Sequence, residues 1–132
     1  MRKPLILIAI TIGLALILAA CGGGESAEPE QPPEESVPAG DAAAGEPVFQ
    51  ATCSACHGQD AKGLPNLGKD MTASVFIAET SDADMLAFVK VGRPVTHADN
   101  TTGVDMPPKG GNPALSDEEI LDVIAYIRTL QQ

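Results

Sequence analysis

Two cysteines and a histidine stand together in the run Cys53-Ser54-Ala55-Cys56-His57. Thiol and imidazole side chains bind metals, exchange disulfides and attach cofactors, so chemistry is expected at this run. A zinc site would need a fourth ligand, and outside the run only His97 remains as a histidine or cysteine of the folded part. A redox-active thiol pair would need a strand-rich βαβ context, which the sequence lacks. A structural disulfide, with the histidine incidental, is the third alternative.

The order of these residues favours a different chemistry. The pattern C-x-x-C-H is typical of covalent attachment of c-type haem. Two thiols at this spacing can add to the two vinyl groups on one edge of a porphyrin, and the adjoining histidine is then placed under the iron as an axial ligand. The sequence therefore predicts one covalent haem c, attached at Cys53 and Cys56 and ligated by His57.

Segments on both sides of this run extend the pattern to residues 42–132. Gly45 and Phe49 precede Cys53 at helical spacing, the segment Leu64-Pro65-Asn66-Leu67 follows the run, and Asp122 to Arg128 lies near the C-terminus. Together these segments resemble the class I cytochromes c. The resemblance implies a small all-α cytochrome c fold, with three or more helices around the covalently attached haem.

The resemblance also implies roles for single residues. The Pro65 carbonyl would accept a hydrogen bond from Nδ1 of His57 and orient the imidazole, while Leu67 would pack on the porphyrin face. Gly45 would permit a close helix crossing, and Phe49 would cover the haem edge.

A low-spin electron carrier needs a second axial ligand, and a methionine thioether there raises the reduction potential. Met106 precedes Pro107-Pro108 on a Gly- and Pro-rich loop, and this segment resembles the ligand loop of the family. The prolines restrict the backbone around Met106, so less entropy is lost when its sulfur is fixed at the iron. Met71 and His97 are the alternative ligands, whereas Met85 lies on the apolar face of a helix and is expected to pack in the core.

Helix signals place these residues. A helix is predicted over Ala42 to Thr52, with Asp41 as its N-cap and Pro47 as an irregularity. Ser81 is predicted to cap a second helix that runs through Val91 and ends at Gly92. Between them no strand is convincing, and the nearest candidate is the segment 74–78.

The last helix has the clearest signals. Ser116 and Glu119 form a capping box, which predicts the helix start. The residues that follow form one apolar stripe at helical spacing: Ile120, Val123, Ile124, Ile127 and Leu130.

The N-terminal part of the chain reads as targeting rather than fold. Residues 1–20 combine Arg2 and Lys3 with an apolar stretch and a small-residue end, which predicts a signal peptide. Leu18-Ala19-Ala20-Cys21 resembles a lipoprotein lipobox, so Cys21 is the predicted lipidation site. Residues 21–41 are the lipidated cysteine and an acidic Pro/Gly-rich linker, which has too little apolar surface to fold. The domain is therefore predicted on the extracytoplasmic (periplasmic) side of the bacterial membrane, lipid-anchored.

Charge and ligation together limit the function. The formal net charge is −10, from 18 acidic and 8 basic residues, and this excludes nucleic acid as a partner. With both axial positions filled by protein, substrate has no open site, so the chain is predicted to be a one-electron carrier rather than an enzyme. Its expected partners are redox proteins with a basic docking face. One alternative is a permanently bound subunit of a quinol-oxidising or oxidase complex, such as alternative complex III; another is a haem sensor or peroxidase-like protein.

Overall fold

The computed structural model describes residues 36–132. Its helices are α1 (Ala42–Thr52), α2 (Ser54–His57), α3 (Val75–Glu79), α4 (Asp82–Val91), the 3₁₀ helix η1 (Pro108–Gly111) and α5 (Asp117–Thr129). Within these residues no strand forms, and the predicted all-α class is confirmed. The predicted leader, Cys21 and the linker as far as residue 35 lie outside the described residues.

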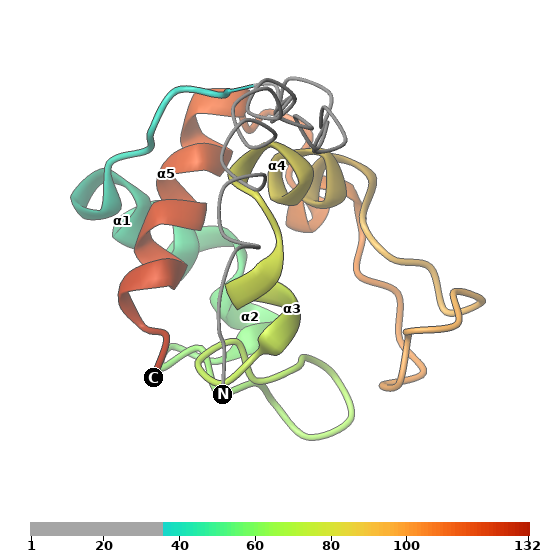
Figure 1. Cartoon of the computed structure of the whole chain (residues 1–132). Helices are drawn as coiled ribbons and strands as arrows, with labels where there is room; N and C mark the ends of the chain where they lie inside the picture. Colours follow the sequence, from blue (N-terminus) through green and yellow to red (C-terminus); the bar gives the residue numbers. More distant parts are fainter. Residues whose placement is uncertain (1–35) are drawn as a thin grey trace, which may run out of the picture. The chain divides into compact units, whose positions relative to one another are not determined.

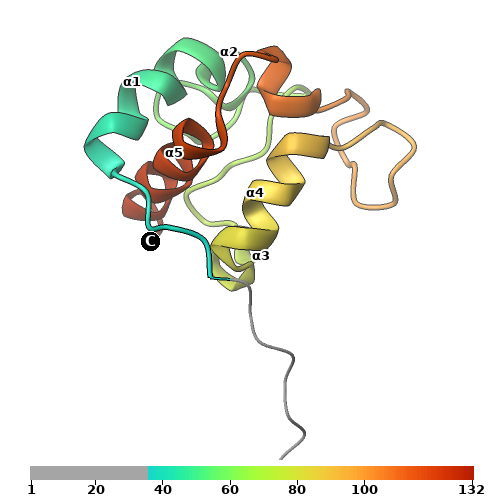
Figure 2. The same cartoon turned by 90° about the horizontal axis from the view of Figure 1, so that it is seen from above.

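Helices α1 and α5 lie side by side and make the most extensive helix contact of the domain (Figures 1 and 2). Helix α1 starts where predicted, because the Asp41 carboxylate accepts the main-chain N–H of Ala43 at 2.8 Å. A Cβ atom on Gly45 would lie 2.0 Å from the carbonyl oxygen of Asp122, so only glycine allows this close approach. The close crossing expected at Gly45 is therefore confirmed.

Packing against α5 begins before α1. The main-chain N–H of Asp41 donates to the Asp122 carboxylate at 2.7 Å. A Cβ atom on Gly40 would lie 2.1 Å from the Leu121 carbonyl oxygen, and Val37 packs against the core. The last residues of the predicted linker are thus part of the folded domain.

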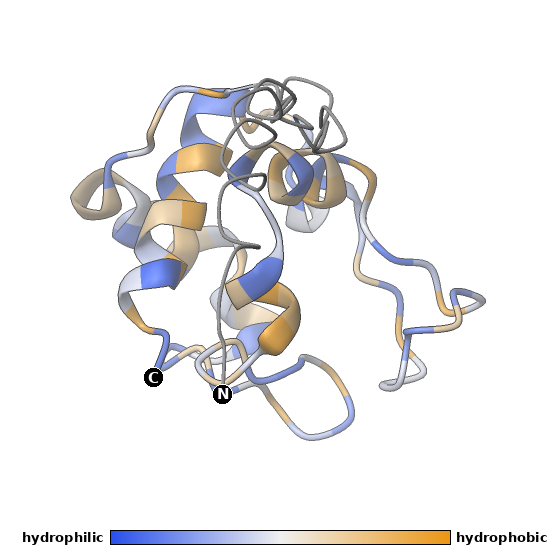
Figure 3. Cartoon of the chain, viewed as in Figure 1, coloured by the Kyte–Doolittle hydropathy of each residue, from blue (hydrophilic) through white to orange (hydrophobic). Residues whose placement is uncertain are grey.

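Helix α5 carries the main part of the core. The capping box is present, with the Ser116 N–H donating to the Glu119 carboxylate at 2.8 Å and the Glu119 N–H to the Ser116 hydroxyl at 3.1 Å. Hydrophobic and hydrophilic residues alternate around the helix (Figure 3). Four residues of the predicted stripe are buried: Ile120, Val123, Ile124 and Ile127. Its last residue, Leu130, is partly buried.

Residues 75–78 of the segment 74–78 are helical, not extended, and Ser74 is the N-cap of their helix α3. The Ser74 hydroxyl accepts the N–H of Ile77 and caps α3, which gives the apolar run a helical start. Arg128 of α5 then holds α3 and α4 together: its guanidinium donates to the carbonyls of Ile77 at 2.7 Å and Thr80 at 2.6 Å, and to the Asp82 carboxylate at 2.7 Å. Helix α4 is capped by Ser81 and ends at Gly92, as predicted.

Over residues 36–132, no helix combines the length and the hydrophobicity that crossing a membrane requires.

The capping box makes the stability of α5 dependent on pH. Hydrogen bonds from Ser116 lower the pKa of the Glu119 carboxyl, so folding favours its ionised form. This stabilisation is present above the ordinary carboxyl pKa of 4.5 and is lost as pH falls through the lower folded value. Glu119→Ala should therefore destabilise the domain at pH 7, and the difference from the unsubstituted protein should shrink on acidification below pH 4.5.

Chemical unfolding between pH 3 and 7 measures this difference. Glu118→Ala is the matched control, because the Glu118 carboxylate makes no hydrogen bond to Ser116 in the described structure. A destabilisation by Glu119→Ala that is the same at every pH would contradict the prediction.

Candidate functional site

A single helical turn presents the cysteines and the histidine together. Cys53 ends α1 and starts α2, and the N–H groups of Cys56 and His57 donate to its carbonyl at 3.2 and 3.0 Å. Residues three and four apart on a helix share a face. The turn therefore directs both thiols and the imidazole into the same space.

The imidazole of His57 is oriented by a main-chain carbonyl. Its Nδ1–H donates to the carbonyl of Lys69 at 3.0 Å. The predicted partner, Pro65, does not make this contact, and the prediction for Pro65 is corrected accordingly. The bond at Nδ1 leaves Nε2 as the ring nitrogen that can bind a metal.

Local geometry explains the change of partner. Residues Leu64 to Leu67 form a turn, with the Leu67 and Gly68 N–H groups donating to the Leu64 carbonyl, and this turn leaves Pro65 exposed. A Cβ atom on Gly68 would lie 2.1 Å from the Cys56 carbonyl oxygen. The chain thus passes close to the cysteine turn at Gly68, and the next residue, Lys69, reaches the imidazole.

Met106 is fixed by main-chain pairing with the residue that follows α4. The N–H of Arg93 donates to the Met106 carbonyl at 2.8 Å, and the N–H of Met106 donates to the Arg93 carbonyl at 2.9 Å. A Cβ atom on Gly92 would lie 2.2 Å from the Met106 carbonyl oxygen, so the pairing needs glycine there. Residues 94–105 form a loop between the paired residues that projects from the helices (Figures 1 and 2).

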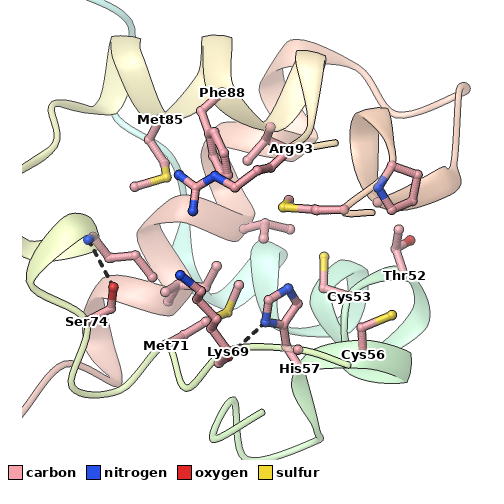
Figure 4. Close-up of a pocket in the computed structure, with 18 of the residues that line it drawn as sticks. Thr52, Cys53, Cys56, His57, Lys69, Met71, Ser74, Met85, Phe88 and Arg93 are labelled. Atoms are coloured by element: carbon pink, nitrogen blue, oxygen red, sulfur yellow. Dashed lines mark hydrogen bonds between the residues drawn. The ribbon is translucent and has the colours of Figure 1, made fainter. Parts of the chain in front are cut away.

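These elements enclose one cavity, part of which is shown in Figure 4. The predicted site residues that line it are Cys53, Cys56, His57, Leu67 and Met106. Apolar side chains of α3, α4 and α5, together with Leu115 just before α5, complete its walls: Phe76, Ile77, Met85, Phe88, Val89, Leu115, Ile120, Val123, Ile124 and Ile127.

Other predicted residues lie elsewhere. Pro65 and His97 do not line the cavity, and the His97 side chain is half exposed. Phe49 is fully buried but packs against Tyr126 in the α1–α5 crossing, with ring centroids 5.4 Å apart, rather than at the cavity. Met71 lines the cavity, and so does Met85, which is also buried in the core as expected.

Burial shifts the pKa values of the Cys53 thiol and the His57 imidazole toward their neutral forms. Burial, and secondarily the neighbouring Cys56, raise the pKa of the Cys53 thiol to about 11. Burial lowers the pKa of the His57 imidazole, an effect that its bond to the Lys69 carbonyl opposes. Redox-active cysteines have a lowered thiol pKa, so the raised pKa of Cys53 disfavours that alternative. For zinc, no three side chains of the His, Cys, Asp and Glu types within residues 36–132 are grouped so that they could hold one metal ion.

The donor set fits the haem that the sequence predicts. The thiols of Cys53 and Cys56 lie on one turn, and Nδ1 of His57 is hydrogen-bonded to a carbonyl, which leaves Nε2 free to bind iron. The Met106 thioether lines the same cavity, whose walls are mostly apolar. Sequence reasoning missed two further residues, Lys69 and Arg93. A main-chain carbonyl such as that of Lys69 leaves no signal in a sequence. Arg93 could have been found, because it is a charged residue placed between an apolar helix and the loop that carries Met106.

Comparison with known proteins gives consistent matches. Residues 40–127 match the family model described as cytochrome c oxidase, cbb3-type, subunit III. Cytochrome c-555 of Chlorobaculum thiosulfatiphilum is 33% identical over 87 residues, which cover 66% of this chain and 93% of that protein. Cytochrome c-554(548) of Halomonas halodenitrificans is 38% identical over 97 residues, covering 67% of this chain and 94% of that protein.

An oxidase subunit also matches. Subunit CcoP of the cbb3-type cytochrome c oxidase of Rhodobacter capsulatus is 30% identical over 90 residues. The match covers 67% of this chain and 29% of CcoP, so it concerns one part of that subunit.

Proposed function

We propose a function for this chain from its family: it belongs to the cytochrome c family and is a class I mono-haem c-type cytochrome, a haem electron carrier. On this premise the protein is a membrane-tethered carrier with His/Met ligation, in an extracytoplasmic respiratory or photosynthetic electron-transport chain. The observation that supports it is the convergence of the Cys53 and Cys56 thiols, the His57 imidazole and Met106 on one apolar cavity. Bound there, haem c supplies the one-electron Fe(III)/Fe(II) couple.

The chain holds the proximal side with few degrees of freedom. Cys53 and Cys56 would form the two thioethers, and His57 would bind the iron through Nε2. The carbonyl of Lys69 fixes the ring orientation and tautomer of His57, because a carbonyl accepts only from a protonated Nδ1. Rigid ligands and a water-poor cavity reduce the reorganisation that accompanies a change of charge.

Met106 is the sixth ligand in this proposal. Its main-chain pairing with Arg93 and the prolines after it restrict the thioether before any metal is bound. Met71 is less suited, because its N–H donates to the Ala61 carbonyl in the loop after the cysteine turn and its side chain lies on the His57 side of the cavity (Figure 4). His97 lies outside the cavity lining.

Optical spectra of the membrane fraction, oxidised and reduced, test the proposal beside a denaturing gel stained for covalent haem. A stained band at the mass of this chain, a low-spin spectrum and an iron–thioether charge-transfer band are expected. A high-spin resting spectrum with ready carbon monoxide binding would instead support the sensor or peroxidase-like alternative.

Membrane tethering depends on Cys21, which lies outside the described residues. Cys21→Ala should move the protein from the membrane fraction to the soluble fraction, because it removes the thiol that would carry the diacylglyceryl group, whose two acyl chains hold a protein to a bilayer far more firmly than one chain does. Immunoblotting of the two fractions measures this change. A variant that stays with the membrane would show that the apolar leader is retained as the anchor.

Lys69 links the two sides of the cavity. Its carbonyl orients His57, while its ammonium donates to the Asp99 carbonyl of the loop that ends at Met106, at 2.9 Å. Lys69→Met removes only the second contact. Ferrous protein should then bind carbon monoxide about two- to fivefold faster, the scale of one exposed hydrogen bond of about 0.5–1 kcal/mol.

Stopped-flow mixing with carbon monoxide measures that rate. Lys62→Met is the control, because it removes a lysine charge from a position that does not line the cavity. Equal rates in both variants would show that the Lys69 ammonium does not restrain the loop.

A docked subunit is the second candidate, and the match to cbb3-type subunit III favours it. The acidic chain would meet a basic face of its redox partner. Purification at high salt separates the two candidates, since a mobile carrier dissociates while a permanent subunit stays with its complex.

A further inference from the structure

Arg93 places a guanidinium group against two adjacent aromatic rings at the cavity. Its Cζ atom lies 5.0 Å from the ring centroid of Phe76 and 4.7 Å from that of Phe88. The two rings meet edge to face, with centroids 5.2 Å apart. Cation–π contacts of this kind fix the position of the group and are worth about 0.5–2 kcal/mol.

The guanidinium has no acceptor among the described residues. No hydrogen bond or ion pair of its side chain occurs there, although it is half buried and lines an apolar cavity. Arg128, the other arginine of the described domain, donates to two carbonyls and one carboxylate. Aromatic faces do not satisfy the N–H donors of a guanidinium, so these donors are open to a carboxylate that enters the cavity.

The two carboxylates in the cavity lining, those of Asp70 and Asp105, are otherwise engaged. Asp105 lines the cavity, but its carboxylate accepts the main-chain N–H of Val95 and forms no ion pair with Arg93. The Asp70 carboxylate accepts the N–H and the hydroxyl of Thr72 and forms no ion pair with Arg93. Other polar groups of the lining, Asn100, Thr102 and Lys69, are neutral or cationic. This part of the lining is therefore prepared for a carboxylate that the protein itself does not supply.

The covalent chemistry of the site indicates where such a carboxylate comes from. The two vinyl groups and the two propionates of haem stand toward opposite edges of the porphyrin, so the thiols fix the direction of both. In Figure 4 the guanidinium of Arg93 points away from Cys53 and Cys56, toward the other end of the cavity. A propionate would reach that end once the vinyl edge is joined to the cysteines.

We propose that Arg93 binds a haem propionate through its guanidinium fork, with Phe76 and Phe88 holding that fork in place. The proposal rests on the proposed function, because it requires covalent haem. A guanidinium matches the two oxygens of a carboxylate, and the aromatic contacts reduce the entropy lost on binding. Neutralising the propionate also affects the iron, because a nearby positive charge favours the ferrous state.

The position allows a clean test. The contact of Arg93 with Met106 uses main-chain atoms, so substitutions of the side chain keep that pairing. Arg93→Gln should shift the redox-linked infrared bands of haem that is isotope-labelled at its propionate carboxyl groups. It should also weaken the preference for the ferrous state about tenfold, which corresponds to about 59 mV in a one-electron couple. Arg93→Lys should shift the infrared bands but keep most of the potential, since it retains the charge without the fork.

Lys62→Gln is the control for charge alone, because Lys62 does not line the cavity. Covalent haem and a low-spin spectrum in each variant would support the proposed function. The propionate bands and the potential then test the role of Arg93 independently of that function. Unchanged propionate bands in Arg93→Gln would overturn the proposal, as would a potential shift no larger than that of Lys62→Gln. A change confined to the reaction rate with a redox partner would also overturn it, and would make Arg93 a docking residue.

Discussion

Cys53→Ser combined with Cys56→Ser should give a chain without covalently held haem and with little folded domain. The two thiols lie on one helical turn, and no other cysteine occurs in residues 36–132 to replace them. The cavity that they face is walled by the core side chains of α4 and α5, including Met85, Ile120 and Ile124. Without the porphyrin these side chains lose their packing partner, and folding loses the free energy of cofactor binding.

A haem-stained denaturing gel and circular dichroism measure the two effects. Ser54→Ala is the matched control within the same turn, because it removes only a hydroxyl bond to the Gln50 carbonyl and leaves both thiols. That variant should keep its haem. Mass spectrometry adds a direct reading of the unsubstituted protein: thiols that are free, or joined to each other, would contradict covalent attachment.

Signals that act over a few residues were sufficient to predict the main helices. Asp41, Ser81 and Ser116 each cap a helix at the expected position, because a cap depends on the side chain itself and on the N–H groups two or three residues later. The close approach of α1 and α5 at Gly45 could also be predicted, although only from resemblance to a family.

Signals that depend on the tertiary path were not sufficient. The apolar run after Ser74 is compatible with a strand or a buried helix, and only its cap and its place under Arg128 make it helical. The partner of His57 is a carbonyl twelve residues away, and every residue has a carbonyl. The choice of Lys69 over Pro65 follows from the path of the loop past Gly68, which no side-chain pattern records.

The candidate site divides in the same way. Covalent attachment of haem could be predicted because it requires two thiols at a fixed spacing in the sequence. The position of Met106, in contrast, depends on main-chain pairing with Arg93 across a loop of intervening residues. The role of Arg93 becomes visible only in the fold, where Phe76 and Phe88, from two different helices, pack together against its guanidinium. Thus the residues that would attach the haem are adjacent in the sequence, whereas the residues that surround it come from distant segments.

Met106→Ala should abolish the iron–thioether band and lower the reduction potential by on the order of a hundred millivolts, since the choice of axial ligands spans about 0.8 V. A thioether stabilises ferrous iron, and alanine has no donor to replace it. The main-chain pairing with Arg93 does not need the methionine side chain, so the loop should keep its path. The vacated position should then bind carbon monoxide in the ferrous protein. Spectroelectrochemical titration and carbon monoxide difference spectra measure these changes.

Met71→Leu and Met85→Leu are the matched controls, because both methionines line the same cavity. Each variant keeps the apolar volume while removing a sulfur, and each should retain the band and most of the potential. If Met106→Ala kept the band and Met71→Leu lost it, the sixth ligand would be Met71. If no methionine variant changed the band and His97→Ala altered the low-spin spectrum, ligation by two imidazoles would replace the His/Met proposal, and the expected potential would fall accordingly.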